Sequence, residues 1–195
     1  MASNEPELGL RECPCLGAEA PEVLIHTDGG SRPNPGPGGW AAILWAPGWE
    51  LELGGGAGDT TNNRMELSAA LAGLNALTKP SRVLLVTDSE YLFSGMTDWI
   101  TKWSRLGFRK KKGTLLNPDL WRRLAEAALE HDTSWAWTRG HSGAALNERC
   151  DVLAAEMIDA AHGDELVPTH SSRCPRAGAM PAVEGTKTAG IWLPA

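Results

Sequence analysis

The run Val83-Leu84-Leu85-Val86 restricts the fold of this 195-residue chain more than any other segment. An uninterrupted apolar run of this length is typical of a strand that is buried on both faces of a sheet. Leucines and alanines at helical spacing precede it, from Asn63 to a stop at Lys79-Pro80. Further helices are predicted at about 90–106, 117–130 and 145–161. A buried strand between helices predicts an α/β fold.

The remaining strands are predicted from shorter patterns. Residues 23–27 form an apolar run that ends at Asp28-Gly29-Gly30, and residues 134–138 form another strand-like run. Residues 40–45 and 49–53 flank Ala46-Pro47-Gly48, a turn sequence that predicts a hairpin. Hairpin strands followed by strands that alternate with helices predict a mixed sheet with helices packed on it.

Both ends of the chain differ from the middle in composition. Residues 1–22 carry five acidic residues and one arginine, and both ends are rich in Pro, Gly, Ala and Ser without sustained periodicity. We therefore expect a disordered acidic extension at 1–21, one folded domain at 22–162 and a disordered tail at 163–195. The apolar end at 191–195 is interpreted either as an inert terminus or as a contact for a partner protein or for the domain itself.

The sequence also bounds where the chain acts. No apolar run reaches the roughly 18 residues of a membrane-spanning helix, and the first residues lack the pattern of a secretion signal. The four cysteines form no C-x-x-C pair, which argues against a zinc site or a disulfide framework. We expect a cytoplasmic protein.

Two predicted strands end alike, in Thr27-Asp28-Gly29 and in Thr87-Asp88-Ser89. If the strands are parallel neighbours, both aspartates project from the carboxyl edge of the sheet, where open α/β sheets place their ligand sites. The alternative is that each aspartate caps the turn or helix that follows it.

Two further acids stand near predicted helix starts. Glu66 follows Asn63 at the spacing of a capping box, and Asp151 is interpreted alternatively as a charge that favours the helix dipole. Four carboxylates that converge on one sheet edge repel each other unless cations occupy the cluster. An all-oxygen site favours Mg²⁺, and a pair of Mg²⁺ ions suits in-line phosphoryl displacement.

Six stretches together resemble type-1 ribonuclease H of the bacterial kind, over about residues 22–161. They are Thr27-Asp28-Gly29, Asn34-Pro35-Gly36-Pro37-Gly38-Gly39-Trp40, Thr60-Thr61-Asn62-Asn63-Arg64-Met65-Glu66-Leu67, Thr87-Asp88-Ser89, Gly140-His141-Ser142-Gly143 and Asn147-Glu148-Arg149-Cys150-Asp151. The resemblance implies the ribonuclease H-like fold, a five-stranded mixed sheet with helices on both faces. It also implies a monomeric endoribonuclease that cleaves the RNA strand of RNA–DNA hybrids and leaves 5′-phosphate and 3′-hydroxyl ends.

The same resemblance assigns roles to individual residues. It implies two Mg²⁺ ions per active site, with Mn²⁺ as a substitute, held by the catalytic carboxylates Asp28, Glu66, Asp88 and Asp151. His141, in a glycine-rich loop, would assist proton transfer or product release. The residues that it assigns to substrate binding are Asn34, Thr61, Asn62, Glu90, Trp99, Trp103, Lys110, Lys111, Lys112 and Asn147.

The formal net charge of −6, taken alone, argues against a nucleic-acid partner, but the basic residues are concentrated in one stretch. Residues 102–113 contain six basic residues and no acid, interleaved with aromatic residues as in a surface that grips a nucleic-acid backbone. The resemblance places a DNA-binding protrusion here. The alternatives are a solvated helix end for the charges and a core position for Trp103.

Two positions depart from the family pattern. Asp59 stands where many relatives have arginine beside a DNA phosphate, and Glu90 stands where bacterial relatives often have glutamine. Both changes bear on affinity for the hybrid. The alternatives to the enzyme are a non-catalytic hybrid-binding module and another nuclease of the same superfold.

Overall fold

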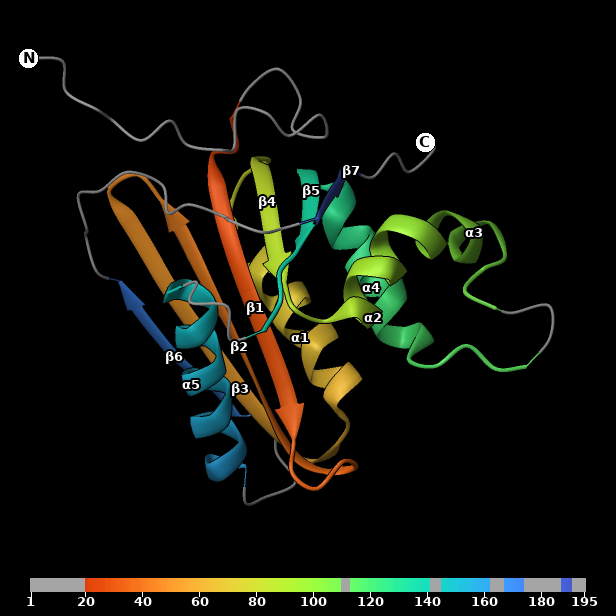
Figure 1. Cartoon of the computed structure of the whole chain (residues 1–195). Coiled ribbons are helices and arrows are strands. Elements are labelled where there is room, and N and C mark those ends of the chain that lie inside the picture. Colours follow the sequence, from red (N-terminus) through yellow and green to blue (C-terminus); the bar gives the residue numbers. More distant parts are fainter. Residues whose placement is uncertain (1–19, 110–112, 141–144, 162–166, 174–186, 191–195) are drawn as a thin grey trace, which may run out of the picture.

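The computed structural model describes residues 20–109, 113–140, 145–161, 167–173 and 187–190. At its centre are five strands: β1 (Val23–Ser31), β2 (Gly36–Ala46), β3 (Trp49–Thr60), β4 (Arg82–Thr87) and β5 (Asp132–Trp137). They lie side by side in the order β3-β2-β1-β4-β5 (Figure 1). β1, β2 and β3 pair antiparallel, whereas β4 pairs parallel with both β1 and β5. The predicted five-stranded mixed sheet is confirmed.

The helices are α1 (Asn62–Asn75), α2 (Glu90–Ser94), α3 (Ile100–Arg105), α4 (Pro118–Leu129) and α5 (Ala145–Ala160). A π-helical turn, Gly95–Trp99, joins α2 to α3, so the helix predicted over about 90–106 is interrupted in its middle. The helix predicted to run until Lys79-Pro80 ends earlier, with Ala76 as its C-cap. Among the described helices, none combines the length and the apolar character needed to cross a membrane.

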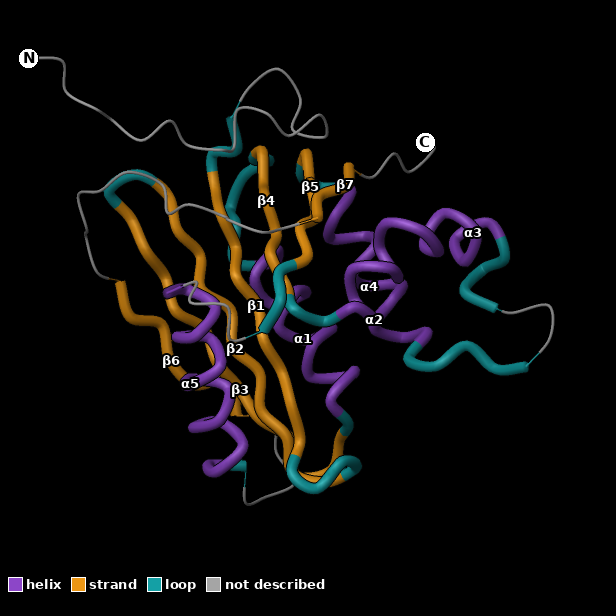
Figure 2. The backbone as a smooth tube through the Cα atoms, viewed as in Figure 1, coloured by secondary structure: helices purple, strands orange, loops and turns teal. Residues whose placement is uncertain are grey.

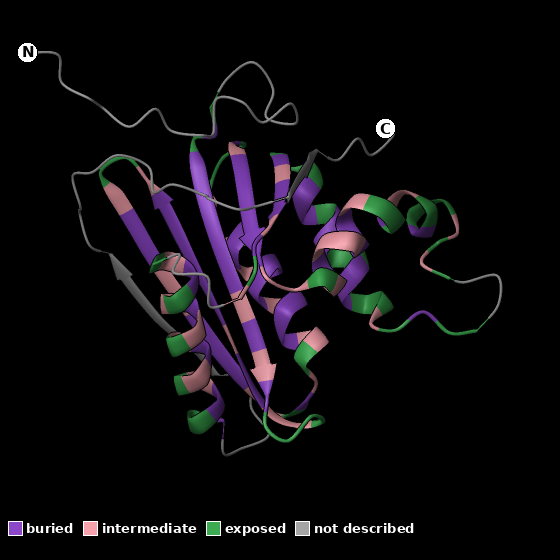
Figure 3. Cartoon of the chain, viewed as in Figure 1, coloured by how far each residue is buried: buried purple, intermediate pink, exposed green. Residues whose placement is uncertain are grey.

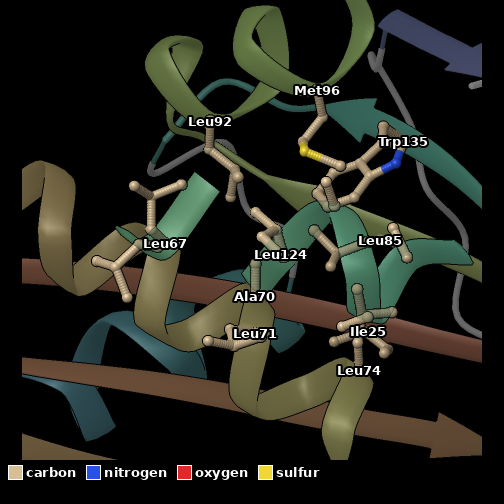
Figure 4. Packing of buried hydrophobic residues seen from close by; sticks show 14 of the residues in the cluster. Ile25, Leu67, Ala70, Leu71, Leu74, Leu85, Leu92, Met96, Leu124 and Trp135 are labelled. Carbon is tan, nitrogen blue, oxygen red and sulfur yellow. The ribbon is translucent and has the colours of Figure 1, made fainter. Parts of the chain in front are cut away.

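Helices cover both faces of the sheet, as Figure 2 shows for α1 and α5. On one face, Ile25 and Leu85 meet Leu67 and Leu74 of α1 in the main hydrophobic cluster, which Trp135 completes (Figure 4). These side chains are fully buried, and the strands beneath them are buried along most of their length (Figure 3). Alternation of inward side chains along β1 sends Leu24 to the opposite face, into a second cluster under α5.

β3 continues beyond its predicted end at residue 53 through a glycine-rich half to Thr60. Glycine weakens strand propensity, so sequence patterns give no strand there. The close approach of α5 explains the extension, because a Cβ at Gly56 would lie 2.9 Å from the carbonyl oxygen of Met157. A residue without a side chain lets the helix backbone lie directly on the strand.

The first turns of α1 and α4 are joined by an ion pair. Arg64 Nη2 lies 2.9 Å from Asp119 Oδ2, and Arg64 Nη1 donates to Asn117 Oδ1 at 3.3 Å. Both partners are partly exposed, so the pair contributes little to stability and serves mainly to fix the two helix starts relative to each other.

Two segments of the predicted C-terminal tail differ from the sequence expectation. β6 (Val167–Arg173) pairs antiparallel with β3, and β7 (Lys187–Gly190) pairs antiparallel with β5, so each extends one edge of the sheet. Edge pairing uses main-chain groups and needs no apolar pattern, which explains why the polar sequence gave no signal. The expected disorder at 1–19, 162–166, 174–186 and 191–195 lies outside the described residues. The domain boundaries at 22 and 162 stay a prediction.

Candidate active site

The sheet brings Asp28 and Asp88 together. β1 and β4 are parallel neighbours in a register that pairs Thr27 with Thr87, so the two aspartates follow at the same carboxyl edge. This arrangement confirms the prediction that both carboxylates project from one edge of the sheet. Neither aspartate is a helix N-cap, because the cap of α2 is Ser89, whose hydroxyl accepts the N–H of Leu92.

Helix α1 supplies the third carboxylate. Glu66 lies in the second turn, and oxygens of Asp28, Glu66 and Asp88 lie within 4.8 Å of one another. The N-cap of α1 is Thr61, whose hydroxyl accepts the N–H of Arg64 at 3.4 Å. The capping-box interpretation of Asn63 and Glu66 is therefore wrong, and Glu66 turns toward the two aspartates.

The fourth predicted carboxylate, Asp151, comes from α5. It lies in the middle of the helix and forms a side-chain hydrogen bond with Asp28. A position this far from the helix start rules out the favourable dipole charge as its main role. The structure thus brings all four predicted acids to one place, although the tight three-carboxylate cluster contains only Asp28, Glu66 and Asp88.

Burial and mutual repulsion dominate the electrostatics of this cluster. Burial, then the carboxylates of Asp88 and Asp151, raises the pKa of Asp28 from 3.8 to about 7. Burial and the charges of Asp28 and Asp88 raise the pKa of Glu66 well above its usual range. Glu66 Oε2 is also buried without a hydrogen-bond partner. Crowded acids with an unpaired buried oxygen are the donor set that a hard divalent cation fits.

The strand that precedes the predicted His141 loop is anchored to Asp88. Trp137 Nε1 donates to the backbone oxygen of Asp88 at 2.9 Å, and the N–H of Thr138 donates to Thr87 O at 3.0 Å. Gly140 lies so close that a Cβ there would be 2.9 Å from Asp88 Oδ2. The loop therefore begins beside the carboxylates, while His141 itself lies outside the described residues. Sequence reasoning gave Trp137 no role.

Comparison with known proteins identifies the family of this chain. The RNase H family model matches residues 20–159. The ribonuclease H of Granulibacter bethesdensis is 55% identical over 142 residues, which are 72% of this chain and 95% of that protein. The ribonuclease H of Pelobacter propionicus is 51% identical over 142 residues, 72% of this chain and 87% of that protein. This chain belongs to the ribonuclease H family.

Solved structures of ribonucleases H agree with the fold. LC9-RNase H1, a type 1 RNase H with the type 2 active-site motif, is 30% identical, with a TM-score of 0.66 over 77% of this chain and 79% of that one. LC11-RNase H1, solved in complex with an RNA/DNA hybrid, is 26% identical, with a TM-score of 0.54 over 72% and 99%. A ribonuclease H degrades the RNA strand of RNA–DNA hybrids, and the acidic cluster of Asp28, Glu66 and Asp88 is the active site of this one.

Near this ribonuclease H site, polar residues predicted to bind substrate form one hydrogen-bonded set. Asn62 Oδ1 accepts from the backbone N–H and the hydroxyl of Ser31, at 2.8 and 2.9 Å. Asn34 Oδ1 accepts from the N–H of Asn62 at 3.4 Å and lies 3.3 Å from Ser31 Oγ. Ser31 was not predicted, and its only sequence signal is its place shortly after Asp28 in β1. Glu90 lies exposed at the start of α2.

The residues predicted for the DNA-binding protrusion of this ribonuclease H separate into two groups. Trp99 is 42% exposed. Trp103 is only 7% exposed and packs between Trp99 and Trp121, with ring centroids 5.5 and 5.1 Å away. The core interpretation of Trp103 thus fits the structure better than a substrate contact. Lys110, Lys111 and Lys112 lie outside the described residues.

Asn147 is the predicted substrate residue that the structure places least favourably. Its side chain is 1% exposed, on the face of α5 that turns toward the sheet. Both of its polar atoms are buried without a hydrogen-bond partner. A direct contact between Asn147 and a substrate would require the neighbouring residues to move.

Proposed function

We propose that this ribonuclease H hydrolyses the RNA strand with two Mg²⁺ ions held by Asp28, Glu66, Asp88 and Asp151, with Mn²⁺ as a substitute. The observation that supports this most is the unpaired, buried Glu66 Oε2 within a cluster of raised-pKa carboxylates. Without cations, the crowded carboxylates would stay partly protonated, and they must lose these protons when they bind metal.

The protein residues have distinct tasks in this proposal. Asp28 stands at the centre, because it contacts Asp151 by a hydrogen bond and interacts electrostatically with both Asp88 and Glu66. When bound, the ions would lower the pKa of the attacking water and offset the charge on the scissile phosphate. Hydrolysis would then leave a 5′-phosphate on one RNA product and a 3′-hydroxyl on the other. His141 would move a proton or help release product at the mouth of the site, where the loop begins beside Asp88.

Substrate recognition would use the polar set around Asn62. Only the RNA strand carries 2′-hydroxyls, so amide side chains beside the carboxylates are suited to check the strand that is cut. We propose minor-groove contacts from Asn34, Asn62 and Glu90, and a phosphate contact from Thr61 beyond its capping role. Asp59, exposed at the end of β3, would repel a DNA phosphate and lower affinity.

The DNA strand would lie along the protrusion. Trp99 offers an exposed aromatic face, and the proposal gives the charges to Lys110, Lys111 and Lys112. Affinity is then expected to fall with added salt. We further propose a monomer that acts in the cytoplasm, with a protein contact through the C-terminal tail as a secondary candidate.

A substrate panel tests the proposed function. A labelled RNA–DNA hybrid, duplex DNA and duplex RNA are incubated with Mg²⁺, with Mn²⁺ or with EDTA, and the product ends are mapped. Cleavage of the hybrid alone, abolished by EDTA and by Asp28→Asn or Asp88→Asn, is expected. Normal cleavage by both variants would refute the metal cluster. Binding of the hybrid without turnover would favour a non-catalytic module, and cleavage of duplex DNA another nuclease.

A further inference from the structure

We propose that Gly29 is a positioning residue: it sets the distance between Asp28 and Glu66, and thereby the affinity of the cluster for divalent cations. The proposal rests on the metal-dependent function proposed above. Gly29 follows Asp28 directly on β1, at the point where α1 crosses the strand with Glu66. Nothing in the conformation of Gly29 itself demands glycine, because its φ lies outside the left-handed region.

The space around Gly29 is closed by backbone, not by side chains. A Cβ at this position would lie 2.4 Å from the carbonyl carbon of Met65, 2.5 Å from the nitrogen of Glu66 and 2.8 Å from the oxygen of Met65. Flexible side chains could turn away, but these atoms belong to the helix itself. Restoring an ordinary contact would move the start of α1, and Glu66 with it, by about 1 Å.

The next residue shows that this crowding is local. A Cβ at Gly30 would meet only the end of the Ile158 side chain, at 3.6 Å, which is an ordinary contact. A side chain is therefore excluded at Gly29, which faces Glu66, but not at every position of this strand end.

Gly29 also joins the two carboxylates by hydrogen bonding. Its backbone N–H donates to the carboxylates of both Asp28 and Glu66. One donor between two acids fixes them at a common distance from the strand. Because Gly29 has no side chain, the backbone of Glu66 can lie against it, and the Gly29 N–H then holds the Glu66 carboxylate beside Asp28.

The variant Gly29→Ala tests the steric part, with Gly56→Ala as the matched control. A Cβ at Gly56 also meets the backbone of a helix, 2.9 Å from Met157 O, but this contact lies toward the end of α5, six residues beyond Asp151. Binding of Mg²⁺ and of Mn²⁺ is measured by calorimetry, thermal unfolding is followed alongside, and kcat and KM are measured on a labelled hybrid. We expect both variants to unfold at lower temperature.

Only Gly29→Ala is expected to change the site. Its metal affinity is predicted to fall about tenfold, as for other residues that orient metal ligands, and its kcat about 100-fold, as for an ångström-scale misplacement. KM is expected to rise as well, because Thr61 and Asn62 stand at the start of α1 and would shift with it. The metal titration without hybrid therefore isolates the effect on the cluster. Gly56→Ala should keep the metal affinity and kcat of the parent. Parent-like metal affinity and kcat in Gly29→Ala would overturn the proposal.

A second variant covers the case in which Gly29→Ala does not fold. Glycolic acid incorporated at position 29 replaces the N–H by oxygen without adding a side chain, so it removes the donor alone. Metal affinity about tenfold weaker than that of the parent is expected, and unchanged affinity would overturn the proposal. A parent that binds no Mg²⁺ would instead refute the proposed function itself.

Discussion

Replacement of Asp28 by asparagine is expected to abolish cleavage and yet stabilise the metal-free protein at pH 8. A carboxylate whose pKa is raised by folding contributes its stability below the pKa of the unfolded chain, and that contribution is lost as the pH rises through the folded value. For Asp28 this window runs from 3.8 to about 7. At about 1.4 kcal/mol per pKa unit, the penalty at pH 8 is on the order of 4 kcal/mol.

Urea unfolding followed by far-UV circular dichroism measures this penalty. Parent and Asp28→Asn are compared in EDTA between pH 4 and pH 8. The free energy of unfolding should be similar for both at pH 4, and the variant should gain steadily until about pH 8. Added Mg²⁺ should narrow the gap, because it stabilises the folded parent by binding its ionised carboxylates.

Asp119→Asn is the control with the opposite sign. The hydrogen bond from Arg64 lowers the pKa of Asp119, so its contribution is present above the unfolded pKa and is lost as the pH falls. Because Asp119 is exposed, its variant should lose less than about 1 kcal/mol at pH 8. A gain in Asp28→Asn that is equal at pH 4 and pH 8, or no gain at all, would refute the electrostatic reasoning.

Three further outcomes are expected. Trp103→Ala should lose roughly 3 kcal/mol in urea unfolding because it empties a core site, whereas Trp99→Ala should keep stability and raise KM for the hybrid. Arg149 lies 2.8 Å from the buried Glu50, and Arg149→Ala should cost about 2 kcal/mol in the same assay by leaving that charge unpaired; an unchanged midpoint would contradict this. Deletion of 163–195 should retain hybrid cleavage, because the family match ends at residue 159, and an inactive product would contradict the predicted domain boundary.

Patterns of apolar residues were sufficient for most of the fold. Val83-Leu84-Leu85-Val86 became β4, buried between β1 and β5, because a continuous apolar run can be satisfied only by cover on both faces. The hairpin around Ala46-Pro47-Gly48 formed as predicted, with Gly48 in the left-handed conformation. Local propensity failed where backbone contacts decide, as in the glycine-rich half of β3 and in the edge strands β6 and β7.

The active site likewise has features that the sequence predicts and features that depend on packing. The sequence by itself predicted which acids meet at the sheet edge, since Asp28 and Asp88 end matching strands and the family motifs carry Glu66 and Asp151. Only the tertiary structure decided their chemistry, because the raised pKa of Asp28 arises from burial and from carboxylates that lie far away in the chain. It also decided that Trp103 is core and that Gly29 meets the backbone of α1. Contacts between distant segments depend on packing, and no local pattern records them.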